Sequence, residues 1–224
     1  TILYVTVGNS PNTSGVFDSL IYAIQHPLVS SDTQFVPVIS ISYGGCEQQD
    51  LSLSYIEYME QYLEEANAQG QTVVASSGDD GSATCDDTDN ANTAASKGLA
   101  VDYPASSQYV TGVGGTSFSG DLNDQSAYWN NDNNADNGSA LGYIPESVWN
   151  NTPTLAGLSN AGQLSASGGG VSALFSKPSW QVGSGVPGDG MRDVPDVALA
   201  ADPNHNGYVL CTEETNSAGT QLTG

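Results

Sequence analysis

The chain has 224 residues, enough to bury a core within a single domain, and it is strongly acidic. It has 25 Asp and Glu residues against three Lys and Arg, which gives a formal net charge of −22. This charge argues against nucleic acid and anionic membranes as partners, because like charges repel and the sequence has no basic patch.

The acidity has two interpretations. It can give a highly soluble surface, or it can indicate a working pH of roughly 4, where carboxylates titrate. Glu60 and Glu64 favour the second. They are four residues apart on a predicted helix, and no Lys or Arg lies nearby to pair with them. Such a like-charge pair destabilises a helix when both groups are ionised. We therefore expect a protein that lives in acid, with halophilic acidity as the alternative.

The first 80 residues alternate between predicted strands and helices, which is typical of a parallel sheet with right-handed crossovers. Strands are predicted at 1–8, 35–43 and 72–75, and helices at 16–28 and from about 54 to 70. The second helix starts with the capping-box pattern Ser54-x-x-Glu57 and ends at Gly70. Its expected core face consists of Ile56, Met59, Leu63 and Ala66.

The later part of the chain is less regular. A fourth strand is predicted at 110–113, and a long Asn-, Gly- and Ser-rich surface loop of the same domain at about 120–170. Further strands are expected at 171–175, 195–200 and 208–210, with a turn at 202–207.

The three cysteines allow one disulfide and leave one thiol over. Cys46 and Cys85 each follow a predicted strand end, so they can meet at one edge of the sheet and pair. Cys211 then awaits a partner beyond Gly224. This favours an oxidising, extracytoplasmic location, and three free thiols are the alternative. No apolar run is long enough to span a membrane, and Thr1 begins no signal peptide.

Asp79 is the first candidate for chemistry. The predicted strand at 72–75 runs directly into a glycine-flanked turn, Ser77-Gly78-Asp79-Asp80-Gly81. Ligands of open α/β sheets bind where parallel strands end, so Asp79 would lie at such a place. The alternative is that Asp79 only forms the turn.

Three other motifs have plainer alternatives. Ser117 follows two glycines and has the position of a nucleophile or of an ordinary loop serine. Residues 202–213 formally match a calcium-loop pattern, but a tight turn between strands explains them better. His26 and His205 are the only histidines, and a helix end and a turn, rather than a Ser-His-Asp triad, account for them.

Several segments together resemble the sedolisin family, the serine-carboxyl peptidases that are acid-active relatives of subtilisin. The matching stretches, in the family's order and over nearly the whole chain, are 38–44 with Glu47, 75–81, 103–107, 110–116, 168–172 with Phe175, Pro178 and Trp180, 194–198, 201–203 and 207–208.

The resemblance implies a fold and a set of site residues. The fold would be three-layer α/β with a mainly parallel, subtilisin-like sheet, truncated at both ends. Asp79 would be the oxyanion-hole residue, a protonated acid that donates to the tetrahedral intermediate. A Glu would replace histidine as the base, which fits the scarcity of histidine. Tyr43 would support the acid network, and the substrate cleft would be bordered by Gly44, Gly45, Ser77 and Gly78.

The chain also departs from the family's pattern. No segment matches the family's nucleophile motif or its catalytic Glu and Asp, and the family's calcium site would lie downstream of Gly224. No cofactor or metal is therefore expected within the chain itself. We expect the middle part of a single catalytic domain, 1–224, from a secreted peptidase, inert until the missing parts are added.

The partners implied are a peptide or protein substrate, the missing N- and C-terminal parts of the domain, and a prosegment. Two alternatives remain: a non-catalytic binding module that uses the loops of residues 120–150, and a hydrolase that uses Ser117.

Overall fold

A computed structural model of the chain describes most of its residues. These are residues 2–10, 13–26, 35–86, 95–135, 138–152, 164–205, 207–208, 213–215 and 221–223. Within this part of the chain, no helix has the length and hydropathy that a membrane span requires.

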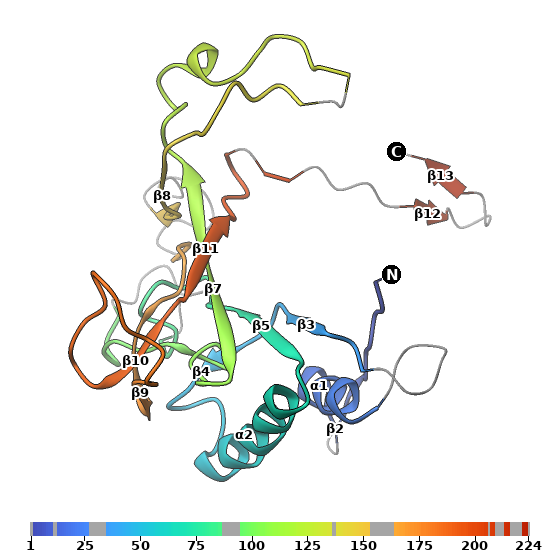
Figure 1. Ribbon diagram of the computed structural model, residues 1–224, viewed down its shortest axis with the longest axis vertical. Coiled ribbons are helices and arrows are strands. Elements are labelled where there is room, and N and C mark those ends of the chain that lie inside the picture. Colours follow the sequence, from blue (N-terminus) through green and yellow to red (C-terminus); the bar gives the residue numbers. More distant parts are fainter. Residues whose placement is uncertain are drawn as a thin grey trace.

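Four parallel strands form the central sheet, in the order β11-β7-β5-β3 (Figure 1). Their bounds are Val197–Ala200 for β11, Val110–Phe118 for β7, Thr72–Ser76 for β5 and Val38–Ile41 for β3. Strand β8 (Glu146–Val148) adds antiparallel to the end of β7. The α/β class with a mainly parallel sheet is thus confirmed, with β3 shorter and β7 longer than predicted.

Helices α1 (Val16–Gln25) and α2 (Leu53–Ala68) pack together and share one hydrophobic core with the sheet (Figure 1). The core face of α2 is the predicted one: Ile56, Met59, Leu63 and Ala66 are all buried. From α1 the core receives Phe17, Leu20, Ala23 and Ile24. Burying each large aliphatic side chain stabilises the fold by roughly 1.5–3 kcal/mol, so this stripe explains why α2 forms where it does.

Helix α2 begins two residues earlier than the capping box predicted. Ser52, not Ser54, is the N-cap: its backbone is extended, and its hydroxyl accepts a hydrogen bond from the N–H of Tyr55 at 3.2 Å. At the other end, Gln69 is the C-cap and Gly70 follows with φ of 85°, a conformation that glycine adopts without strain.

The prediction of a buried strand at 1–8 is wrong for residues 2–8. They form no strand, and all except Val5 are exposed. A strand needs a neighbour for its backbone N–H and C=O groups. The apolar pattern is present in this segment, but among the described residues no strand pairs with it.

Short antiparallel pairs complete the described structure. They are β1 (Asn9–Ser10) with β2 (Thr13–Ser14), β4 (Gly45–Cys46) with β6 (Asp102–Tyr103), β9 (Gly170–Ser176) with β10 (Met191–Val194), and β12 (Glu213–Thr215) with β13 (Gln221–Thr223). The described part of the predicted loop at 120–170 contains the 3-10 helix η1 (Gln125–Ala127) and β8.

A buried arginine joins β10 to the centre of the sheet. Arg192 is fully buried, and its two terminal nitrogens donate to Asp196 at 2.7 and 2.6 Å. Asp196 also accepts from the N–H of Gly112 in β7 at 2.8 Å. The guanidinium lies 5.0 Å from the centre of the Trp180 ring. A charge so buried is tolerated because it is paired in two-point geometry, and the pair fixes the link between β10 and β11 against β7.

Candidate active site

Asp79 lies in the turn that follows β5, at the carboxyl end of the sheet. Gly78 precedes it with φ of 104°, a conformation that glycine adopts readily and other residues avoid. The side chain of Asp79 is exposed. Partial burial of its carboxyl group raises the pKa above the ordinary value, and the charge of Asp80 raises it further. The turn therefore presents to solvent a carboxyl group that holds its proton more tightly than usual.

The turn is held by the segment just before β9. The backbone of Ala166 donates to the carbonyl of Asp79 at 2.8 Å, and Gly168 donates to the carbonyl of Gly78 at 2.7 Å. Ser77 is buried and its hydroxyl donates to the carbonyl of Gly168 at 2.7 Å. The Ser77 side chain thus belongs to the scaffold of the turn, and its predicted contact with substrate stays a prediction.

Gly168 is required by this close approach. A Cβ atom at position 168 would lie 1.9 Å from the carbonyl oxygen of Ser77. Backbone atoms cannot move aside as a flexible side chain can. The turn and its clamp therefore form one rigid unit around Asp79.

A second carboxylate, Asp102 in β6, lies beneath the turn. A Cβ atom at position 78 would come within 2.3 Å of its Oδ2, and one at position 44 within 3.4 Å of its Cβ. Asp102 thus lies between Gly44 and Gly78, two of the glycines predicted to border the cleft. Burial raises the pKa of Asp102 to about 6, and nearby carboxylates add to the rise. The hydrogen bond that Thr84 donates lowers the pKa but does not cancel this rise.

The disulfide expected between Cys46 and Cys85 is present in the structure, with 5.0 Å between the two Cα atoms. It links β4 to the loop that follows the Asp79 turn. The N–H of Cys46 also donates to Asp50 Oδ2 at 2.7 Å, and Gly45 lies against the same carboxylate. Cys211 lies outside the described residues.

Tyr43 follows β3 at the same edge and is 49% exposed. Its ring meets Phe17 edge to face, with 5.9 Å between the centroids. Because β3 and β5 are parallel neighbours, with Ile41 opposite Ala75, the chain leaves both strands at the same end. The structure therefore brings Tyr43, Gly44 and Gly45 to the edge that carries Asp79, and their roles toward substrate stay predictions.

Glu60 and Glu64 are the like-charge pair from which a protein that lives in acid was predicted. The carboxylate of Glu60 accepts hydrogen bonds from Tyr103 and Ser107, both at 3.1 Å. Burial raises its pKa above the ordinary value against these two hydrogen bonds, and the charge of Glu64 adds to the rise. The like-charge pair thus acts in the predicted direction, as the smallest of the contributions.

Ser117 lies in a different cluster, near the carboxyl end of β7 and four residues beyond Val113, the last residue that pairs with β5. Its hydroxyl donates to Asp202 Oδ2 at 2.7 Å, and Asn151 donates to Asp202 Oδ1 at 2.6 Å. Burial opposes ionisation of Asp202, but its hydrogen bonds outweigh burial and hold its pKa below the ordinary value. The backbone N–H of Asn204 donates a further bond, and the charge of His205 acts in the same direction. A carboxylate with a lowered pKa is a weak base, so this pair is a poor candidate for activating a serine.

His205 also lies in this cluster rather than in a triad. Its Nε2 is 2.6 Å from Oδ1 of the fully buried Asp121, whose Oδ2 accepts from the indole N–H of Trp129 at 2.5 Å. His26 ends α1, as predicted: its N–H donates to the carbonyl of Tyr22 at 3.0 Å. Among the described residues, no group of three or more His, Cys, Asp and Glu side chains is arranged to hold a metal ion.

Sequence reasoning missed two residues of the site, Asp102 and Gly168. The signal for Asp102 was a carboxylate within the otherwise apolar run from Leu99 to Tyr103. Gly168 lies in a run of three glycines that matched the resemblance but received no role. Both meet the Asp79 turn only through the fold, so their roles required the structure.

Comparisons with known proteins agree with this geometry. The model of the subtilase family matches residues 1–175. Sedolisin from Pseudomonas sp. (strain 101) is 37% identical over 165 residues, which cover 73% of this chain and 24% of sedolisin. Kumamolisin from Bacillus sp. (strain MN-32) is 33% identical over 225 residues, 96% of this chain and 33% of kumamolisin. The chain thus spans between a quarter and a third of these relatives.

A solved structure supports the same assignment. Pseudomonas sedolisin, a serine-carboxyl proteinase complexed with two molecules of pseudo-iodotyrostatin, aligns with a TM-score of 0.60 and 31% identity. The alignment covers 86% of this chain and 44% of that one, and it confirms the three-layer, subtilisin-like α/β fold. The chain belongs to the subtilase family and, within it, to the sedolisin-type serine-carboxyl peptidases.

Proposed function

We propose that the chain is part of a single acid-acting peptidase domain that hydrolyses peptide bonds through an acyl-enzyme. Residues 1–224 would be the middle of that domain, with the segment at about 120–170 as a loop insertion. The observation that carries the proposal is the Asp79 turn: a clamped, glycine-preceded carboxyl group at the carboxyl end of β5, with a raised pKa. A donor to the oxyanion has to be rigid, exposed and protonated, and Asp79 meets these demands in acid.

The chemistry follows from the proton on Asp79. A carboxylate only accepts hydrogen bonds, whereas a carboxylic acid donates one to the oxygen on which negative charge develops. Partial burial and Asp80 both favour the protonated form. The proposed donor is therefore present at low pH and lost as the pH rises through the pKa of Asp79. This gives a physical reason for activity in acid.

Other groups must come from outside these 224 residues. The sequence holds no segment that matches the family's nucleophile or its Glu and Asp, so we propose that the isolated chain is inert. The proposed partners are a peptide or protein substrate, further N- and C-terminal parts of the domain, and a prosegment. A calcium site would belong to those further parts. The Cys46–Cys85 disulfide and the charge of −22 support secretion into an acidic, oxidising medium.

Two variants of Asp79 test the proposal in the complete peptidase. Asp79→Ala removes the donor, and kcat should fall about 10²- to 10³-fold at pH 4. In Asp79→Asn the amide donates at any pH, so the loss at pH 4 should be smaller and the decline of kcat toward neutral pH should weaken. A merely structural role would make the two pH profiles parallel. Full activity of Asp79→Ala would refute the role, and turnover by the isolated chain would mean that the nucleophile lies within it.

A further inference from the structure

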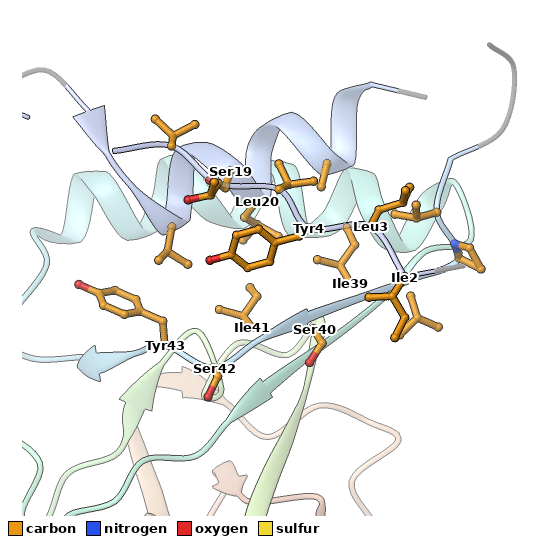
Figure 2. A pocket seen from close by; sticks show the side chains of 18 residues that line it. Ile2, Leu3, Tyr4, Ser19, Leu20, Ile39, Ser40, Ile41, Ser42 and Tyr43 are labelled. Carbon is orange, nitrogen blue, oxygen red and sulfur yellow. The ribbon is translucent and has the colours of Figure 1, made fainter. Parts of the chain in front are cut away.

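Glu47 is a fully buried carboxylate that comes directly after β4. Figure 2 shows Ser42 and Tyr43 just beyond the end of β3, where the chain leaves the sheet and continues toward β4 and Glu47. Among the described residues, Glu47 belongs to none of the ion pairs. A buried carboxylate without a cation needs hydrogen bonds to its oxygens. The donors to Glu47 therefore show what it holds in place.

Both oxygens of Glu47 accept from β9. Oε2 accepts from the hydroxyl of Ser172 at 2.7 Å, and Oε1 accepts from the backbone N–H of Ala173 at 2.5 Å. The oxygen of Ser172 in turn accepts from the N–H groups of Leu174 and Phe175, at 3.1 and 3.0 Å. Both lone pairs of this hydroxyl are thus in use, and its proton is directed to Glu47. Position 47 therefore requires two acceptor atoms, which a carboxylate offers and an amide does not.

Strand β9 depends on such an anchor because it lies outside the central sheet. Among the described strands it pairs only with β10. The backbone N–H groups of Ala166 and Gly168, just before β9, hold the turn that carries Asp79. A group that fixes β9 therefore also fixes the clamp on this turn.

The backbone of Glu47 is fixed independently of β9. Its N–H donates to the carbonyl of Val101 at 3.1 Å. The preceding residue, Cys46, is joined by the disulfide to Cys85, in the loop that follows the Asp79 turn. Glu47 thus connects β9 to a part of the fold that is already tied to the other side of the same turn.

We infer that Glu47 is a positioning residue for Asp79: its carboxylate anchors β9, and with it the clamp that holds the Asp79 turn in place. The inference rests on the proposed function, since it assigns Glu47 an action through Asp79 and none on the substrate itself. A misplacement of about 1 Å can lower the rate of an enzyme about 10²-fold. A loosened clamp should therefore lower kcat and leave KM almost unchanged.

Glu47→Gln in the complete peptidase tests the anchor and keeps the size of the side chain. The amide nitrogen only donates, and both partners of Glu47 in β9 donate as well. We expect kcat in acid to fall about 10- to 100-fold. KM should change by less than about threefold, because an interaction that acts on the transition state is lost and substrate binding is not.

The Asp79→Ala background shows whether Glu47 acts through Asp79. Once the carboxyl group of Asp79 is gone, Glu47→Gln should lower kcat by less than about threefold, because residues that act as a unit are not additive. Asp121→Asn is the matched control. Asp121 is as fully buried as Glu47 and accepts from the side chains of Trp129 and His205, in the cluster around Asp202. Its effect on kcat should be the same with and without Asp79.

Amide hydrogen exchange of the complete peptidase gives a second readout, which does not depend on turnover. In Glu47→Gln the N–H groups of Ala166 and Gly168 should exchange at least about tenfold faster than in the parent, while those of β3 and β5 keep their rates. Asp121→Asn should leave the clamp unchanged. Ser172→Ala removes one of the two hydrogen bonds, so it should show a smaller effect of the same kind, and it replaces Glu47→Gln if that variant does not fold.

Three outcomes would overturn the inference. They are full activity of Glu47→Gln, an equal loss of kcat in the parent and in the Asp79→Ala background, and unchanged exchange at Ala166 and Gly168. Full activity of Asp79→Ala would instead refute the proposed function. Exchange at the clamp would then still decide whether Glu47 holds the turn.

Discussion

Asp102, beneath the turn after β5, and Asp202, after β11, are almost equally buried, with exposed fractions of 7% and 6%. Their pKa values nevertheless move in opposite directions. Burial raises that of Asp102 to about 6. The hydroxyl of Thr84 donates to it and lowers the pKa without reversing the rise, and the carboxylates of Asp80, Asp50 and Asp79 add to the rise.

Asp202, in contrast, is surrounded by hydrogen-bond donors. Its two oxygens accept from the amide of Asn151, the hydroxyl of Ser117 and the backbone of Asn204, and His205 is nearby. Burial still opposes its ionisation, but the donors outweigh burial and hold the pKa below the ordinary value.

Burial favours the protonated form of both carboxyl groups, whereas the donors and neighbouring charges around Asp102 and Asp202 differ. Asp79 and Asp102 lie close to other carboxylates at the turn after β5, so both take up protons at a higher pH than an ordinary Asp. Asp202 accepts from three donors and stays ionised to a lower pH than an ordinary Asp.

The largest expected effect concerns the Cys46–Cys85 disulfide. This bond links β4 covalently to the loop after the Asp79 turn, whereas hydrogen bonds join Ser117 and Asn151 to Asp202. The bond joins residues 39 apart in sequence. Opening a loop of that length should lower the free energy of unfolding by about 4 kcal/mol. Urea unfolding of Cys46→Ser, Cys85→Ser and the double variant at pH 4 measures it. All three should lose the same amount, and a loss below about 1 kcal/mol would contradict the expectation.

Gly78→Ala is the next largest perturbation, because it strikes the contact between the Asp79 turn and Asp102. The new Cβ combines an unfavourable φ of 104° with a distance of 2.3 Å to Asp102 Oδ2. Strain and overpacking together should cost about 3 kcal/mol. Gly70→Ala is the control, since its φ is 85° and nothing lies within 4 Å. It should cost about 1 kcal/mol, and equal losses would mean that the contact with Asp102 is not tight.

Most of the fold could be predicted because its signals are local. The 3.6-residue spacing predicted every core residue of α2, and the apolar runs predicted β3, β5 and β7 in order. Residues 2–8 failed because an apolar alternating pattern reports what a strand would bury, not whether a partner strand is there. Ser54 failed as a cap because Ser52, two residues earlier, adopts the extended backbone that a cap requires.

Less of the site could be predicted, for the same physical reason. The turn that carries Asp79 was predicted from its own sequence, and the pairing of Cys46 with Cys85 from strand ends. The contact of Asp102 with Gly78 and the bond from Ser77 to Gly168 join residues 24 to 91 positions apart. Neither leaves a local pattern. The contrast between Asp102 and Asp202 is of this kind as well, since their donors come from distant strands and loops.

That contrast predicts opposite pH dependences. The folded state binds the proton of Asp102 more tightly than the unfolded state, so its contribution is fully present below the ordinary pKa of 3.8 and lost as the pH rises through about 6. Between pH 4 and pH 7 this group should cost the parent chain about 2 to 3 kcal/mol of stability. Asp102→Asn should remove that decline, as urea unfolding at a series of pH values would measure.

Asp202 has the opposite sign. Its lowered pKa gives stability that is present above the ordinary value and lost as the pH falls through the folded one. Asp202→Asn should therefore destabilise the chain by about 2 kcal/mol at pH 7, because it leaves the donors of Ser117 and Asn151 facing an amide, and by less at pH 3. Parallel pH profiles for Asp102→Asn and Asp202→Asn would mean that donors do not distinguish the two carboxylates, and burial alone would then have to explain both.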